Sequence, residues 1–189
     1  MSRTPAILFT IALVLLAWLW MQGVHELGHV LAAWSSGGTV ERVVWHPLAI
    51  SRTDVGINPQ PLFVVWAGPL IGALLPLGMW RVAGACRWRL AWMWRFFAGF
   101  CSLANGLYLG VGSFGAIGDA GDLLRLGAPR WSLWLFGIAA ATAGLALWNG
   151  TGAKLGLGKS PEPVSWQAAA AAWAALAGTV LMLACLSPR

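Results

Sequence analysis

Three ionisable residues, His25, Glu26 and His29, stand within five positions of an otherwise apolar stretch. The span from Ala6 to Trp34 contains no other ionisable residue. His25 and His29 are four positions apart, so on a helix they lie on one face, one turn apart. Two imidazoles at this spacing can bind one metal ion, and Glu26 lies close enough to act on a water at that ion without being a ligand. The pattern H-E-x-x-H therefore predicts a metal site with Glu26 as its catalytic base.

An alternative interpretation is a pair of histidines that pack between helices and bond to neighbouring carbonyls. Glu26 would then need a buried partner of its own, because an unpaired carboxylate is costly in an apolar environment. The chain has only three histidines, and two of them belong to the motif. This concentration favours the metal site.

The composition is that of a membrane protein. Of the 189 residues, 59% are hydrophobic and only 10% are charged, whereas soluble domains have about 25% charged residues. The fourteen tryptophans fit the interfaces between membrane and water. The lysines and arginines are spread over loops and form no basic stripe interleaved with aromatic residues, so we expect the lipid bilayer and not nucleic acid as a partner.

Five apolar runs approach or exceed the length of about 20 residues that a bilayer requires. We therefore expect an all-α polytopic membrane protein, a single membrane-embedded domain over residues 1–189, with the first span uncleaved because no A-x-A site follows it. The expected spans are Pro5–Ser35, Pro61–Val82, Trp92–Val111, Trp131–Trp148 and Ser165–Leu186.

Residues 39–58 differ from the spans, because they are rich in β-branched side chains and are bounded by Gly38 and Pro59. The pattern predicts a small β-hairpin with strands at Thr39–Trp45 and Leu48–Val55. It follows the helix that carries the motif, so it lies at the same membrane face. Its edge could pair with an extended peptide, or the hairpin could simply cover the helix ends.

A third ligand is needed, because catalytic zinc usually has three protein ligands and one open position. The Gly-rich segment 112–126 offers Asp119, with Asp122 as the alternative, in what we expect to be a re-entrant stretch followed by a short helix at Ala120–Leu126. Asp119 could instead cap that helix. His46, in the hairpin, is more readily interpreted as a surface histidine than as a ligand.

The motifs together resemble the site-2 protease family of intramembrane zinc metalloproteases. H-E-L-G-H ends the first span, A-G-P-L-I-G lies in the second, and D-A-G-D-L, beginning at Asp119, is similar to the family's D-G-G-R-L. The chain departs from the family at Gly118, where leucine is usual, and after Asn105, where the family's Asn-x-x-Pro lacks its proline. The resemblance implies Zn²⁺ held by His25, His29 and Asp119.

The implied function is hydrolysis of a peptide bond in or near a transmembrane segment of another membrane protein, in the bacterial cytoplasmic (inner) membrane. Glu26 would act as general base and then protonate the leaving amine. The alternative is a non-catalytic metal-binding membrane protein that binds or regulates partner helices. An ion or proton transporter fits less well, because the polar residues form one cluster and no inverted repeat is visible.

The charge distribution and the family resemblance imply opposite orientations in the membrane. The loop between the second and third spans carries arginines at 81, 87, 89 and 95, and the positive-inside rule places such a loop in the cytoplasm. The motif would then face the other side of the membrane. The family resemblance implies instead that the active site faces the cytoplasm.

Overall fold

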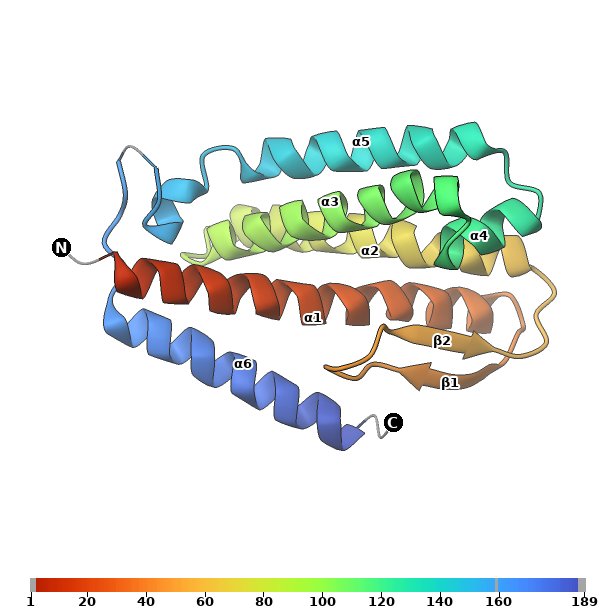
Figure 1. Cartoon of the computed structure of the whole chain (residues 1–189), viewed down its shortest axis with the longest axis horizontal. Helices are drawn as coiled ribbons and strands as arrows, with labels where there is room; N and C mark the ends of the chain where they lie inside the picture. Colours follow the sequence, from red (N-terminus) through yellow and green to blue (C-terminus); the bar gives the residue numbers. More distant parts are fainter. Residues whose placement is uncertain (1–2, 159, 187–189) are drawn as a thin grey trace.

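The structure, a computed structural model, describes residues 3–158 and 160–186. Six α-helices, one short 3-10 helix and a two-stranded sheet follow one another along the chain (Figure 1). They are α1 (Thr4–Ser35), β1 (Val40–Val44), β2 (Arg52–Val55), α2 (Pro61–Ala85), α3 (Ala91–Gly115), α4 (Gly118–Arg125), α5 (Arg130–Trp148), η1 (Gly152–Leu155) and α6 (Trp166–Leu186).

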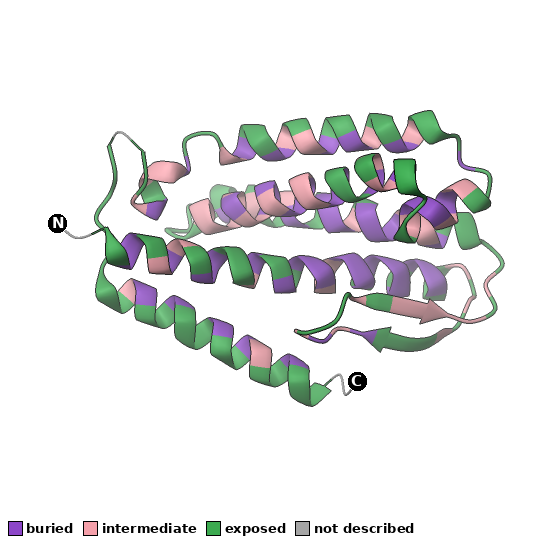
Figure 2. Cartoon of the chain, viewed as in Figure 1, coloured by how far each residue is buried: buried purple, intermediate pink, exposed green. Residues whose placement is uncertain are grey.

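Five of these helices, α1, α2, α3, α5 and α6, are long and apolar enough to cross a membrane. The expected class, an all-α polytopic membrane protein with a small hairpin between the first two spans, is confirmed. Figure 2 shows that α5 and α6 expose most of their outer surface, whereas buried residues are concentrated in the second half of α1. A bilayer can cover exposed apolar surface of this kind.

Small residues let the central helices approach closely. A Cβ on Gly106 would lie 2.9 Å from the Gly137 carbonyl oxygen, and a Cβ on Gly137 would lie 2.8 Å from the Gly110 Cα. Gly106 and Gly110, which form a G-x-x-x-G pair in α3, therefore form the contact with α5, as such pairs do between membrane helices. This contact fixes α3, the helix that precedes the aspartate segment.

The hairpin packs beside the second half of α1 (Figure 1). Its strands are antiparallel, with Val43 opposite Thr53 and Val44 opposite Arg52. The prediction of a second strand from Leu48 was wrong, because that strand begins only at Arg52. The residues after His46 instead form a turn, in which the Leu48 N–H donates to the His46 ring at 3.2 Å.

The Gly-rich segment is more helical than expected. α3 continues to Gly115, beyond the predicted end at Val111, and the irregular backbone is limited to Ala116, Ile117 and the left-handed Gly118 with which α4 begins. Ala116 adopts a left-handed conformation with φ of 49°, and the Ile117 N–H bonds to the Gly112 carbonyl at 3.1 Å. The predicted re-entrant stretch is therefore a tight two-residue link between α3 and α4.

α4 begins at Gly118 and not at Ala120. Asp119 consequently lies in its first turn, and the N-cap position is held by Ile117 with no side-chain cap. The carboxylate of Asp119 is thereby free to serve another purpose.

Candidate metal centre

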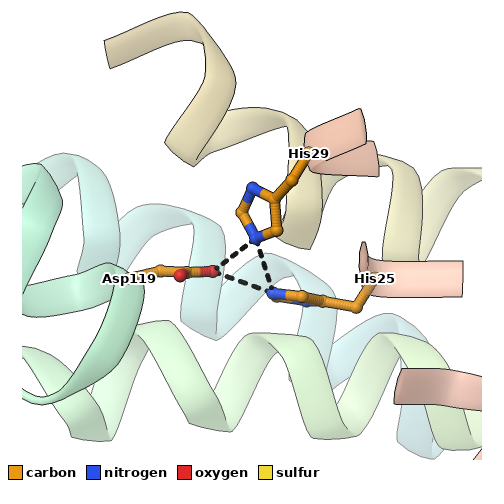
Figure 3. Close-up of side chains that lie close together, drawn as sticks. All are labelled: His25, His29 and Asp119. Carbon is orange, nitrogen blue, oxygen red and sulfur yellow. Dashed lines mark hydrogen bonds and ion pairs between the residues drawn. The ribbon is translucent and has the colours of Figure 1, made fainter. Parts of the chain in front are cut away.

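Side chains from α1 and α4 converge on one point, where His25, His29 and Asp119 face one another (Figure 3). The Asp119 Oδ2 lies 2.8 Å from the His25 Nε2 and 3.3 Å from the His29 Nε2. The two Nε2 atoms are 3.1 Å apart. The three residues can therefore offer ligand atoms to one metal ion, and both histidines are buried.

These distances fit a tetrahedral metal site. With metal–ligand bonds of about 2.0–2.1 Å, a tetrahedral ion has its ligand atoms about 3.3 Å apart. Three donors, two imidazole nitrogens and one carboxylate oxygen, leave a fourth position open. The group can hold a metal ion without large rearrangement.

Each imidazole is fixed through its other nitrogen. The Nδ1 of His25 lies 2.7 Å from the Oδ1 of Asn105, and the Nδ1 of His29 lies 2.9 Å from the backbone oxygen of Val64. An oxygen acceptor requires a proton on Nδ1, so each neutral ring presents an unprotonated Nε2. This is the tautomer that metal binding needs.

Close contact between α1 and α2 sets the position of the rings. A Cβ on Gly28 would lie 2.4 Å from the Ala67 carbonyl oxygen, and a Cβ on Gly68 would lie 2.3 Å from the His29 Nε2. Glycine at both positions lets the helices meet beside the histidines. The position of His29, the last residue of the H-E-x-x-H motif, thus depends on Gly28, which lets α1 approach α2.

Asp119 is held by its surroundings as well as by the histidines. Its backbone N–H donates to the Tyr108 hydroxyl at 3.2 Å. When the rings of His25 and His29 carry a proton on Nε2, they donate hydrogen bonds to the Asp119 carboxylate. Burial raises the pKa of the Asp119 carboxyl, but these bonds and the ring charges hold that pKa below its usual range. The carboxylate is therefore ionised at neutral pH, as a ligand must be.

Glu26 is almost completely buried, with 4% of its surface exposed. Its Oε2 accepts a hydrogen bond of 2.7 Å from the Thr53 hydroxyl in β2. One turn earlier on α1, the Gln22 side chain accepts a hydrogen bond of 3.1 Å from the Ser51 N–H. The hairpin is thus bonded directly to the residue predicted as the base.

The other two candidate ligands lie outside the cluster. Asp122 forms an ion pair with Arg125 on the exposed side of α4. His46 is buried, not a surface residue as predicted, and its ring accepts the turn hydrogen bond from Leu48. Neither belongs to the metal-binding group found among the described residues.

The sequence did not indicate three supporting residues. Asn105 stood out as a polar residue in an apolar span, but its partner lies 80 positions away. Thr53 is one of several β-branched residues in the hairpin, and Gly68 belongs to the A-G-P-L-I-G motif, which does not show that it faces the histidines. Their roles depend on tertiary contacts that no local pattern encodes.

Comparison of the chain with family models, with curated proteins and with solved structures finds no match. The class of protein is therefore defined only by the fold and by the cluster of His25, His29 and Asp119. The chain has the architecture of an integral membrane protein and carries a buried group of two histidines and one aspartate that could hold a metal ion.

Proposed function

We propose that the protein is an intramembrane zinc metalloprotease of the site-2 protease type, acting in the bacterial cytoplasmic membrane. The observation that supports this most is the convergence of His25, His29 and Asp119, with Glu26 next to the first ligand. Two histidines one turn apart on a helix, followed by a distant carboxylate, are typical of zinc hydrolase sites.

Zinc suits this donor set better than the hard cations do. Imidazole nitrogens are common ligands of zinc, whereas Mg²⁺ and Ca²⁺ prefer oxygen ligands alone. When bound, Zn²⁺ supplies a Lewis acid that acidifies a water and polarises a peptide carbonyl. His25, His29 and Asp119 would hold it and leave one position open.

Glu26 would perform the proton transfers. Its carboxylate takes a proton from the attacking water and later gives it to the leaving amine, so the base is restored at the end of the cycle. The Thr53 hydroxyl, 2.7 Å from the Oε2, keeps the carboxylate in one orientation. The buried setting excludes bulk water, which strengthens these interactions.

The substrate would be a transmembrane segment of another protein that unwinds locally. A helix buries its own carbonyls in hydrogen bonds, so the scissile bond must become extended before it can be attacked. The described sheet has two strands, which leaves β2 with one edge that has no strand partner. An extended substrate segment could pair with that edge. The same strand carries Thr53, which donates a hydrogen bond to Glu26.

The decisive variant is Glu26→Gln. Purified protein is incubated with a panel of single-span peptides, with and without a chelator, and products are identified by mass spectrometry. We expect the wild type to cleave at least one peptide and the chelator to stop it. Glu26→Gln should abolish cleavage and retain zinc, and Glu41→Gln, which changes a carboxylate in β1, should cleave normally.

Persistent cleavage by Glu26→Gln would contradict the mechanism. Zinc binding by the wild type with no cleavage of any peptide would favour the second function, a non-catalytic metal-binding membrane protein.

A further inference from the structure

A large apolar groove lies between α1, α2 and α3, and His25, His29 and Asp119 are not among its lining residues. Two adjoining hollows of about 890 and 580 Å³ form it, and both are lined by Leu75, Met79, Trp88 and Trp94. Each is within the range of about 300–1,000 Å³ that is usual for ligand sites. The groove extends along α1 as far as Val24, the residue before His25.

The groove has one charged end. Arg87 and Arg89, in the loop after α2, line it together with Trp88, whereas the remaining lining is almost entirely apolar. Arginine and tryptophan at the end of an apolar groove match the headgroup level of a bilayer. Basic pockets between membrane helices are sites for anionic lipid headgroups.

The two guanidinium groups have no acidic partner within residues 3–158 and 160–186. Among the six acidic residues of the chain, Asp54, Asp122 and Glu162 pair with other cations, and Asp119 pairs with the histidines. The end of the bundle near Arg87 therefore carries unbalanced positive charge. An anionic ligand would balance it.

The backbone at Arg87 has an unusual conformation. The helix α2 ends with the Trp88 N–H bonded to the Ala83 carbonyl and the Arg87 N–H bonded to the Gly84 carbonyl, and Arg87 has a φ of 52°. This position after a helix is usually glycine, because other residues are strained there. Arg87 therefore stands at a strained position at the charged end of the groove.

We propose that the groove binds an anionic phospholipid. Its phosphate would lie at Arg87 and Arg89, and an acyl chain would run past Met79 towards Val24. A phospholipid combines one charged end with a long apolar part, as the groove does. A second copy of the chain fits less well, because most of its carboxylates are already paired.

Gly78 gives a direct way to fill the groove. It lines the larger hollow, and a Cβ added to it would have no atom within 4 Å. Gly78→Phe should therefore occupy the lipid position without disturbing the helix contacts. Gly84→Phe is the matched control, because Gly84 is also in α2 and has equally open surroundings but does not line the groove.

The test is native mass spectrometry of protein purified from vesicles of equal parts phosphatidylglycerol and phosphatidylcholine. We expect the wild type to retain one phosphatidylglycerol, at least about tenfold in preference to phosphatidylcholine. Gly78→Phe and the double variant Arg87→Gln/Arg89→Gln should lose it. Gly84→Phe and Arg81→Gln should retain it, and equal circular dichroism spectra would show that every variant folds.

Equal retention of the two lipids by the wild type would overturn the proposal, as would undiminished retention by Arg87→Gln/Arg89→Gln or by Gly78→Phe. The proposal would also be overturned if the wild type had the mass of a dimer and retained no lipid, and if Gly78→Phe were a monomer. The groove would then bind a second copy of the chain.

Discussion

The chemistry of the cluster depends on residues that fix the imidazole rings. The Nδ1 of His25 bonds to Asn105 and that of His29 to the Val64 backbone oxygen. Such partners orient the ring and set its tautomer, and their loss commonly weakens metal binding by about 10- to 100-fold. Of these two partners, only the Asn105 side chain can be removed by mutation, because the partner of His29 is a backbone oxygen.

Asn105→Leu should therefore weaken zinc binding by about 10- to 100-fold. Leucine has a similar size but cannot accept the His25 hydrogen bond. Competition against a chromophoric chelator measures the affinity. Ser102→Ala, one turn away on α3, is the control because the Ser102 hydroxyl is buried without a hydrogen-bond partner among the described residues. Equal affinities of wild type and Asn105→Leu would refute this role.

Thr53 is the corresponding support for the base. Thr53→Val removes the hydroxyl that bonds to Glu26 and preserves the shape of the side chain. A hydrogen bond to a charged group contributes about 1.5–3 kcal/mol, so peptide cleavage should fall by about 10- to 100-fold. Zinc content should not change, and Thr53→Ser should restore most of the rate. A loss of zinc in Thr53→Val would indicate a structural role instead.

At the level of the elements, the site depends on how closely α1 and α2 approach. Gly28 contacts the α2 backbone at Ala67, and Gly68 contacts the His29 ring. The sequence predicted both helices to within a few residues, and Gly68 lies in the A-G-P-L-I-G motif of the second span, where it is four positions before Gly72. It could not show that this glycine faces the histidines, because helix rotation is set by tertiary packing.

Gly68→Ala should displace the rings, because its Cβ would lie 2.3 Å from the His29 Nε2 and 2.9 Å from the His25 Nε2. We expect zinc affinity to fall by about tenfold or more, comparable to the loss of a ring-orienting partner. Gly84→Ala, in open surroundings on the same helix, should bind zinc as the wild type does. An unchanged affinity in Gly68→Ala would show that α2 can move away from α1.

The Gly-rich aspartate segment was the least predictable element. Its glycines suggested an irregular re-entrant stretch, but all four belong to α3 or α4, two of them as the last residue of α3 and the first of α4. Gly121, for example, lets α4 pack against the link, since a Cβ there would lie 2.2 Å from the Ala116 carbonyl oxygen. Glycine at such contacts serves packing and not flexibility.

In the molecule as a whole, the cluster connects α1 to α4 across 94 positions of sequence. The convergence of the two motifs could be anticipated, because alternate spans run in the same direction and bring their ends to one membrane face. The sequence also favoured Asp119 over Asp122, through the resemblance of D-A-G-D-L to the family motif. What it did not show is that α4 begins at Gly118, which places Asp119 in the first turn of that helix. A metal ion at this point would tie distant parts of the chain together.

Metal removal should therefore destabilise the fold. A ligand at 100 times its dissociation constant stabilises the native state by about 2.7 kcal/mol, which corresponds to about 5–10 °C in Tm for a chain of this size. Thermal unfolding in detergent, followed by fluorescence, should show this decrease after chelation and its reversal by added zinc. His29→Ala should show no response to the chelator. A Tm that chelation leaves unchanged in the wild type would contradict a metal shared between α1 and α4.

The most direct measurement is the metal content of purified protein, determined by inductively coupled plasma mass spectrometry for the wild type and three variants. We predict about one zinc per chain in the wild type and in Asp122→Ala, and almost none in His29→Ala and Asp119→Ala. Full zinc content in Asp119→Ala, or no metal in the wild type, would contradict a centre built from His25, His29 and Asp119.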